Sequence, residues 1–200
     1  MAQRKIIVYI ATSADGFIAR RDGSVDWLNR PRTFGDYGMG AFFKTIDTIL
    51  WGRKTYAIGL KFAKEGGGLG YGAEVKNYVF SHRPPKKYAP DVEFVSEPVV
   101  DFAKRLRANP GKNIWMMGGG GIIASFLDAG EIDEFIVHVI PTFIGEGIPL
   151  IAPRQRLIPL KLLSARDFPD GVVRMHYAVE HEKKKSTAAV KKGRATGRST

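Results

Sequence analysis

Four consecutive glycines are the residues of this chain with the clearest chemical use. The apolar run Asn113–Met117 is typical of a buried strand, Gly118–Gly121 follows it, and Ile122–Leu127 has the apolar pattern of a helix. Such a turn leaves backbone amides without partners at the start of a helix, where they can bind a phosphate. The spacing is not that of the G-x-G-x-x-G fingerprint, so a turn that only allows close packing is the structural alternative.

Polar and basic residues follow two further predicted strands. Thr48–Trp51 leads into Gly52-Arg53-Lys54-Thr55, and Asn77–Phe80 leads into Ser81-His82-Arg83. Because the carboxyl ends of parallel strands lie along one edge of a sheet, we expect these residues and the four glycines to line one crevice. Amides, hydroxyls and cations together suit an extended polyanionic ligand, and cations at two strand ends favour NADPH over NADH.

Several other chemistries lack the residues they need. The chain contains no cysteine, which excludes disulfides, thiolate metal sites and cysteine nucleophiles. No G-x-S-x-G motif is present. The four histidines have no metal-ligand spacing, so we predict no metal site; they are His82, His138, His176 and His181.

Length and charge predict one domain followed by a basic tail. The chain has 200 residues and a formal net charge of +11, and seven of these positive charges follow residue 182. We therefore expect a globular domain over residues 1–181 and a disordered tail over residues 182–200. No apolar run is long enough to cross a bilayer, and no signal-peptide pattern opens the chain, so we expect a cytoplasmic protein.

The order of the predicted elements indicates a three-layer α/β/α fold. Lys5–Ala11 is rich in β-branched residues, as expected of a central strand buried on both faces. Strands alternate with helices until a final hairpin, which predicts a mostly parallel mixed sheet with an antiparallel edge. The other predicted elements are helices at Gly40–Ile46 and Pro98–Ala108, strands at Val92–Val95, Glu134–Ile140, Lys161–Asp167 and Val172–Glu180, and turns at Asp15–Gly16 and Pro169–Gly171.

The motifs, in their order, resemble those of a known superfamily. Ile10-Ala11 and Asp15–Ala19 come first, then Gly52–Thr55, Ser81 and Gly118–Ile122. In this order they resemble the dihydrofolate-reductase-like superfamily, and most closely the C-terminal reductase domain of RibD, the bifunctional deaminase-reductase of riboflavin biosynthesis, with its stand-alone relatives. The resemblance extends over residues 4–181 and implies a dihydrofolate-reductase-like fold.

The resemblance implies that NADPH binds across the crevice. Ala11 and Ile18 would lie against the nicotinamide, and the amides of Gly119–Ile122 would hold the pyrophosphate. The phosphates and the adenosine side would be bound by Arg53, Thr55, Ser81 and Arg83. Gly52, Lys54, His82 and Gly118 would line the same crevice.

The implied reaction is hydride transfer to a C=N or C=O carbon held against Ala11, Ile18 and Trp27. The substrate would be pterin-like or a ribosylamino-pyrimidine of the riboflavin pathway. The motifs of the companion deaminase are absent, so only the reduction step is expected. Many relatives carry an acid where this chain has Gly40, so the proton donor stays open between Asp36, Glu146 and a bound water. Donors for a substrate phosphate would be Arg30, Arg32, Lys44 and the Gly145–Gly147 turn.

The closest relatives pair through their later strands, and the apolar run Phe135–Ile144 suits such a contact, so we expect a homodimer. Two other functions stay open. One is a nucleotide-binding module that has the reductase fold without turnover. The other is nucleic-acid binding through the basic tail. We consider a nucleic acid an unlikely partner, because much of the positive charge belongs to a solvated terminus.

Overall fold

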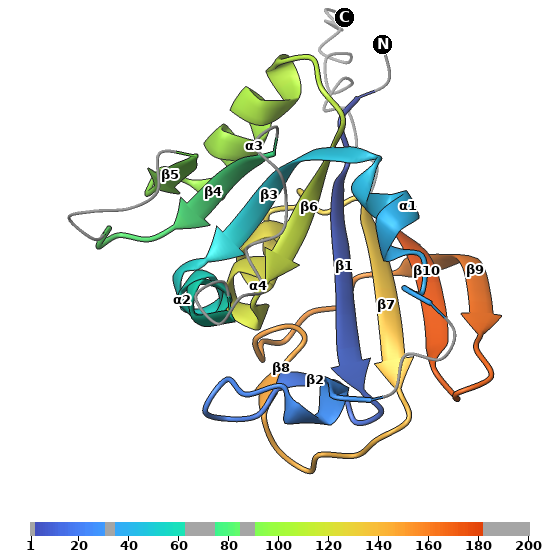
Figure 1. Ribbon diagram of the computed structural model, residues 1–200. Coiled ribbons are helices and arrows are strands. Elements are labelled where there is room, and N and C mark those ends of the chain that lie inside the picture. Colours follow the sequence, from blue (N-terminus) through green and yellow to red (C-terminus); the bar gives the residue numbers. More distant parts are fainter. Residues whose placement is uncertain (1–2, 31–34, 63–74, 85–90, 182–200) are drawn as a thin grey trace, which may run out of the picture.

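The computed structural model describes residues 3–30, 35–62, 75–84 and 91–181. The predicted glycine-rich loop at Gly66–Gly68, Arg32 and the tail over residues 182–200 lie outside the described residues. Figure 1 shows an open, twisted sheet with helices on both faces, as the element order predicts.

Eight strands form the main sheet, in the order β5-β4-β3-β6-β1-β7-β10-β9. The first six strands of this order are parallel to one another, and the hairpin of β9 and β10 joins through an antiparallel pairing with β7. The strands are β1 Ile6–Ser13, β3 Ile46–Gly52, β4 Lys76–Phe80, β5 Val92–Val95, β6 Asn113–Gly118, β7 Glu134–Ile140, β9 Leu160–Asp167 and β10 Val173–Val179. The mostly parallel sheet and the antiparallel C-terminal hairpin are thereby confirmed.

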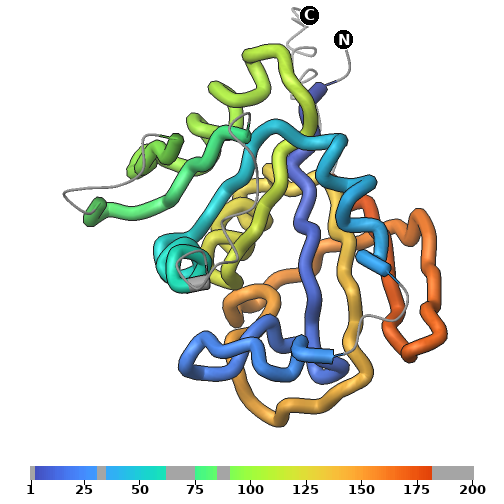
Figure 2. Tube along the Cα trace, in the orientation of Figure 1, coloured from blue at the N-terminus to red at the C-terminus, as the bar shows by residue number. Residues whose placement is uncertain are grey.

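Strand β1 runs through the centre of the sheet, where both of its faces are covered (Figure 2). Ile6 and Val8 point to one face and belong to a core cluster with Phe126. Ile7 and Tyr9 point to the other face and pack in a second cluster with residues such as Trp115. This alternation explains why the segment is apolar at every position, because a strand buried on both faces has no solvent side.

Two helices cover each face of the sheet. Helices α1 (Met39–Phe43) and α2 (Arg53–Phe62) pack on the face of Tyr9. Helices α3 (Val99–Ala108) and α4 (Gly120–Asp128) pack on the opposite face. The helix predicted over Gly40–Ile46 is shorter in the structure. It ends at Phe43, and Ile46 is the first residue of β3.

A small second sheet lies beside the end of β1. Strand β2 (Phe17–Ala19) pairs with β8 (Ile148–Pro149), and a short 3-10 helix (Asp26–Leu28) follows the next turn. The predicted turn at Asp15–Gly16 does fold the chain back, with Gly16 at a φ of 86°. The segment carrying Ile18 is thereby fixed over the carboxyl end of the main sheet, at the bottom of Figure 1.

A buried carboxylate ties β1, β7 and β10 together. Glu134 accepts hydrogen bonds from Lys5 at 2.6 Å and from His176 at 2.9 Å. Burial by itself would raise the pKa of Glu134, but the bonds from Lys5 and His176 outweigh it, so the pKa lies below its ordinary value. The ionised carboxylate therefore stabilises the fold above that ordinary pKa, and the contribution is lost as the pH falls through the folded pKa.

We predict that Glu134→Gln lowers the free energy of unfolding at pH 7 by about 1–3 kcal/mol, because charge-assisted hydrogen bonds are lost at a buried site. Urea denaturation of both proteins measures the difference, which should shrink below about pH 4.5, the ordinary pKa of the group. The control is Glu97→Gln, which removes an exposed pair with Arg105 and should cost less than about 1 kcal/mol. Equal losses in the two variants would contradict the prediction.

Candidate functional site

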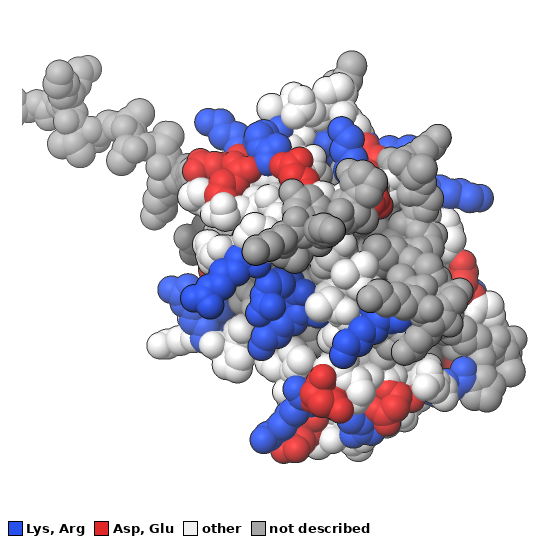
Figure 3. Space-filling view, turned by 60° about the vertical axis from the view of Figure 1, so that its left-hand side comes forward, with Lys and Arg blue, Asp and Glu red and all other residues white. Residues whose placement is uncertain are grey.

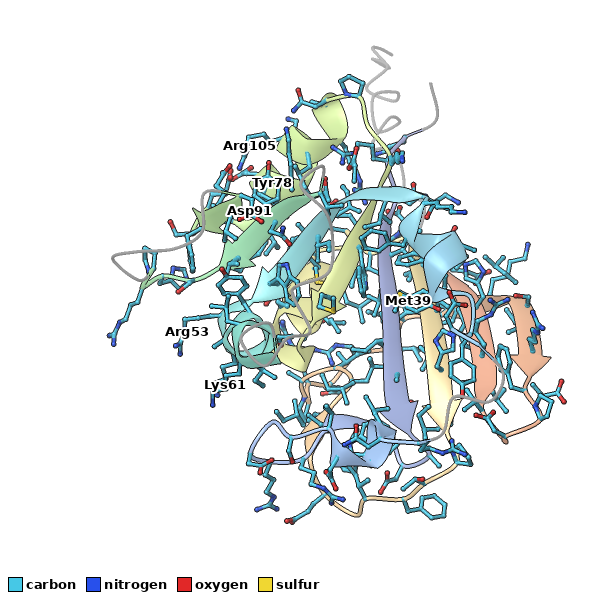
Figure 4. The ribbon with its side chains drawn as sticks, viewed as in Figure 1. Met39, Arg53, Lys61, Tyr78, Asp91 and Arg105 are labelled. Atoms are coloured by element: carbon cyan, nitrogen blue, oxygen red, sulfur yellow. The ribbon has the colours of Figure 1, made fainter. Side chains whose placement is uncertain are left out.

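The three predicted strand ends lie next to one another at one edge of the sheet. Gly52 at the end of β3 is in register with Phe80 at the end of β4, and Trp51 is in register with Gly118 at the end of β6. Strand β1 is the next neighbour of β6, so Ala11 follows along the same edge. Figure 4 shows Arg53 at the start of α2 at this end of β3. The sheet topology therefore brings the residues together as the sequence predicts.

Backbone atoms approach each other closely at the centre of this edge. A β-carbon added to Gly119 would lie 3.0 Å from the Thr55 hydroxyl and 3.5 Å from Cδ1 of Ile18. A β-carbon added to Gly52 would lie 3.4 Å from the carbonyl oxygen of Gly118. The missing β-carbons allow β3, β6 and the β2 segment to approach closely here, and we call the place where Gly119 packs against Thr55 and Ile18 the cradle.

The four glycines do not share one role. Gly118 has a φ of 104°, which favours glycine for conformational reasons. A β-carbon on Gly120 would lie 2.3 Å from the carbonyl oxygen of Pro149, so this glycine allows the chain after β8 to pack on α4. Gly121 has no atom within 4 Å of such a carbon. The structure therefore shows close packing at Gly119 and Gly120 and open space at Gly121, and phosphate binding by the run stays a prediction.

Basic side chains flank the cradle. Arg53 and Lys54 are exposed in the first turn of α2, and His82 and Arg83 are exposed after β4. The Ser81 hydroxyl accepts a hydrogen bond from the Arg83 amide at 3.1 Å, which fixes the turn there. Figure 3 turns this side of the molecule forward and shows basic side chains gathered across the middle of the face. No acidic residue occurs in the segments 52–56, 81–83 and 118–122, so the charge is suited to an anion.

The loop that carries Ile18 is held by one carboxylate. Asp15 accepts hydrogen bonds from the Ser13 hydroxyl at 2.5 Å and from the Gly145 amide at 2.7 Å, with a longer bond from the Ile144 amide. The bond from Ser13, with those from the two amides, lowers the pKa of Asp15. The amides predicted to hold a substrate phosphate at Gly145–Gly147 are therefore partly occupied by Asp15. These hydrogen bonds link the segment after β7 to the turn between β1 and β2.

Trp27 lies in an apolar cluster beside the end of β1. It packs with Ile140 and Phe168, and Ala11 and Tyr37 lie against the same cluster. The indole Nε1 of Trp27 is buried without a hydrogen-bond partner in the described part of the chain. A buried donor that lacks a partner is available to an acceptor on a ligand. The predicted proximity of Trp27 to Ala11 is thus present in the structure.

A buried tyrosine and histidine lie next to Ala11, and sequence reasoning missed both. The Tyr9 hydroxyl is 3.4 Å from Nε2 of His138, and that nitrogen is 3.2 Å from the Tyr37 carbonyl oxygen. Burial raises the pKa of Tyr9 to about 12 and lowers the pKa of His138, so both groups are neutral near pH 7. Tyr37 adopts a φ of 55°, which is uncommon for a residue other than glycine. The one available signal was the polar residue His138 within an apolar strand.

The acids predicted as proton donors have other roles. The carboxylate of Asp36 accepts hydrogen bonds from the Gly40 and Gly38 amides at 2.6 Å and 2.9 Å, which lower its pKa. Asp36 is exposed and caps the start of α1 as an acceptor. Glu146 is exposed and paired with Arg21 at 2.7 Å. Neither geometry supports a proton donor beside Ala11.

Arg30 and Lys44, which were predicted to bind a substrate phosphate, lie in different surroundings. Arg30 donates to the carbonyl oxygen of Asp170 at 2.8 Å, and its Nη1 atom is buried without a partner among the described residues. Lys44 is exposed and immediately follows α1. In the described segments no group of three metal-ligating side chains lies together, and no helix is long and apolar enough to cross a membrane.

Comparisons with known proteins agree on one family. The family model of the RibD C-terminal domain matches residues 4–174. The uncharacterized Bacillus subtilis protein YwjB is 37% identical over 175 residues, covering 88% of this chain and 98% of that protein. YyaP of the same organism, also uncharacterized, is 34% identical over 184 residues, covering 88% and 96%.

Solved structures give the same result. A putative riboflavin biosynthesis protein from Shewanella sp. PV-4 superimposes with a TM-score of 0.76 and 27% identity, covering 88% of this chain and 99% of that one. A Thermotoga maritima diaminohydroxyphosphoribosylaminopyrimidine deaminase/5-amino-6-(5-phosphoribosylamino)uracil reductase gives a TM-score of 0.64 at 18% identity, covering 88% of this chain and 57% of that one. The latter likeness shows the fold.

We predict that Asp15→Ala releases the loop that carries Ile18. Loss of hydrogen bonds worth roughly 1 kcal/mol should speed hydrogen exchange of the Ile144 and Gly145 amides about five- to tenfold. Exchange followed by NMR measures the effect. Asp22→Ala is the matched control, because Asp22 holds only the exposed Ser24 amide in the next turn. Unchanged exchange at Gly145 in Asp15→Ala would show that the carboxylate does not hold the loop.

Proposed function

The chain belongs to the RibD C-terminal domain family, and from this premise we propose that it is an NADPH-dependent reductase that transfers a hydride to a C=N or C=O carbon of a small molecule. The observation that carries the proposal is the backbone cradle at Gly119, between Thr55 and Ile18. It lies in a row of strand ends flanked by cations and free of acids, which fits a dinucleotide with an additional phosphate.

Each side of the cradle has a distinct task. Arg53 and Arg83 bind the phosphate on the adenosine ribose, and Thr55 and the first amides of α4 bind the pyrophosphate. Ala11 and Ile18 form the apolar surface for the nicotinamide, with Trp27 on the substrate side. When bound, NADPH supplies the hydride. The protein orients the reacting carbon and excludes water, since the cluster around Trp27 is apolar.

A proton must also reach the heteroatom of the substrate. Asp36 and Glu146 are engaged elsewhere, so we place this role on the buried pair of Tyr9 and His138, with a bound water as the link to the substrate. Ala11 and His138 are in register on adjacent strands, so the pair lies beside the carbon that accepts the hydride. Because both groups are neutral near pH 7, each can donate a hydrogen bond without carrying a charge.

We propose the same two substrate classes that the sequence indicates, a pterin-like ring or a ribosylamino-pyrimidine. Two relatives support the second class, because the Shewanella and Thermotoga proteins are described as a riboflavin biosynthesis protein and a phosphoribosylamino-uracil reductase. The alternative function is a nucleotide-binding module without turnover. NADPH binding without oxidation, across pterin, flavin-precursor and carbonyl compounds, would favour that alternative.

We also propose a homodimer, but not through the run Phe135–Ile144. Phe135, Val137 and Ile140 are buried within the sheet, so the strand part of this run offers little surface to a partner, although Phe143 beyond the strand is 79% exposed. Strand β9 is exposed at all eight positions and forms the open edge of the sheet. Exposed Leu157 and Leu160 line a cavity of about 540 Å³ whose other walls include apolar side chains of β7, β10 and residues 150–158, and exposed Leu162 follows on β9. A second copy that packs edge to edge covers this surface with its own identical surface.

We predict that Arg53→Gln raises the dissociation constant of NADPH about tenfold and changes that of NADH much less, because the lost charge faces the additional phosphate. Quenching of tryptophan fluorescence during titration measures both constants. Gly119→Val should weaken both cofactors, since its side chain fills the cradle. Lys104→Gln removes the same charge from an exposed position of α3 and should change the dissociation constant of neither cofactor. No binding at millimolar NADPH would reject the proposed function.

For the dimer, we predict that Leu162→Lys gives a monomer in size-exclusion chromatography with light scattering, because a charge is desolvated at the contact. Val100→Lys is the matched control, since Val100 is 47% exposed and Leu162 is 54% exposed, but Val100 lies on α3. A monomeric wild type would exclude the dimer, and a dimer that survives in Leu162→Lys would exclude this surface.

A further inference from the structure

A single row of residues crosses four strands from Ala11 to two arginines. Ala11 is in register with His138, His138 with Arg174, and Arg174 with Arg166. His138 contacts Tyr9 on the face that α1 covers, so the residues of this row point to that face. Because neighbouring strands are about 4.8 Å apart, Arg174 lies roughly 10 Å and Arg166 roughly 14 Å from Ala11, measured between α-carbons.

The two arginines have no acidic partner in the described part of the chain. None of the ion pairs there includes Arg166 or Arg174. The Asp170 carboxylate accepts a hydrogen bond from the Tyr37 hydroxyl, and the Asp170 carbonyl oxygen accepts one from Arg30. The Asp36 carboxylate accepts hydrogen bonds from the amides at the start of α1. Two like charges directly opposite on antiparallel strands destabilise a sheet. The structure therefore carries an unfavourable pair that an anion would relieve.

The surroundings of Arg174 leave room for its guanidinium. A β-carbon on Gly38 would lie 2.9 Å from Nη1 of Arg174, so a side chain at this position would meet the arginine. Gly38 also has a φ of 93°, which glycine adopts most readily. Arg174 is half-buried, whereas Arg166 is exposed, with its guanidinium 4.9 Å from the centre of the Phe168 ring. Packing therefore positions both arginines, Arg174 beside Gly38 and Arg166 over the Phe168 ring.

A second observation indicates a ligand rich in acceptors. Nη1 of Arg30 and Nε1 of Trp27 are buried donors without partners in the described residues. Tyr37 itself contacts Phe168 with ring centres 5.0 Å apart and belongs to the cluster that holds Ala11. Trp27 is a member of the same cluster, so one of these donors lies beside the apolar surface.

We propose that Arg174 and Arg166 bind an anionic group, phosphate or carboxylate, at the end of the substrate remote from the carbon that is reduced. The inference rests on the proposed function, because that function places the reacting carbon at Ala11. The planar guanidinium groups suit either anion, since both offer two oxygens to paired N–H donors. The two arginines thus select substrates by charge, and the apolar cluster accepts the uncharged ring.

Three probes test the site: ribose 5-phosphate for a phosphate source, p-aminobenzoylglutamate for a carboxylate source, and ribose as the uncharged control. Calorimetric titration is carried out on the full chain, with and without saturating NADP⁺. We expect at least one anionic probe to bind about tenfold more weakly to Arg174→Gln and severalfold more weakly to exposed Arg166→Gln. Lys161→Gln, which removes a charge from the same strand, should have no effect.

The outcomes separate the two anions and the two sites. A response of ribose 5-phosphate alone identifies a phosphate, and a response of p-aminobenzoylglutamate alone identifies a carboxylate. Equal affinity in wild type and both arginine variants overturns the proposal, as does ribose that binds as tightly as ribose 5-phosphate. Binding lost in Arg53→Gln but retained in Arg174→Gln also overturns it, because the probe then occupies the cofactor cradle. If NADPH fails to bind while probe binding still depends on Arg174, the proposed function fails and the anion site stands.

Discussion

The register of the parallel strands is the constraint on which the rest of this structure depends. Backbone hydrogen bonds fix β4, β3, β6 and β1 side by side, so their carboxyl ends fall on one line. A slip of one residue would turn every side chain to the opposite face of the sheet. Burial on both faces of β1 prevents such a slip, because Ile6 and Ile7 belong to different core clusters. The hydrophobic core therefore determines the geometry of the edge.

Glycine matters at this edge because it has no side chain. Side chains at Gly52 or Gly119 would fill the space between β3, β6 and the β2 segment, whereas a side chain at Gly120 would collide with the backbone after β8. The same residue type thus allows close packing at Gly119 and Gly120 and leaves open space at Gly121. Composition alone does not separate these roles, because they depend on which neighbour lies opposite each α-carbon.

The sequence is sufficient to predict the fold class, the order of most elements and the neighbouring strand ends. Strongly periodic or continuous apolar segments such as Lys5–Ala11 and the final hairpin are local signals, and the structure confirms them. The short strands β2 and β8 were missed because each has three residues or fewer, too few for a periodic pattern. Most of the strand part of Phe135–Ile144 lies in the sheet interior, and composition could not show this, since an apolar run has the same composition in a sheet interior and in an interface.

The parts of the site formed by distant strands were beyond sequence reasoning. Arg174 is 163 positions from Ala11, and their alignment passes through a parallel and then an antiparallel pairing whose registers no local pattern specifies. Asp36 was chosen because carboxylates serve as proton donors, yet its two amide partners become apparent only when α1 is formed. Tertiary pairing, rather than residue type, decides which polar groups reach the site.

Charge along this side of the sheet has a distribution that suits the proposed hydride transfer. Arg53 and Arg83 lie at one end, Arg174 and Arg166 at the other, and the apolar cluster of Trp27 lies between them. Anionic ends of two ligands would meet cations in partly exposed positions, where ion pairing has a small desolvation cost. The reacting carbons would meet in the apolar middle, where nearby dipoles act strongly and water is excluded. The same sheet register that aligns the strand ends would therefore separate binding by charge from the proposed place of reaction.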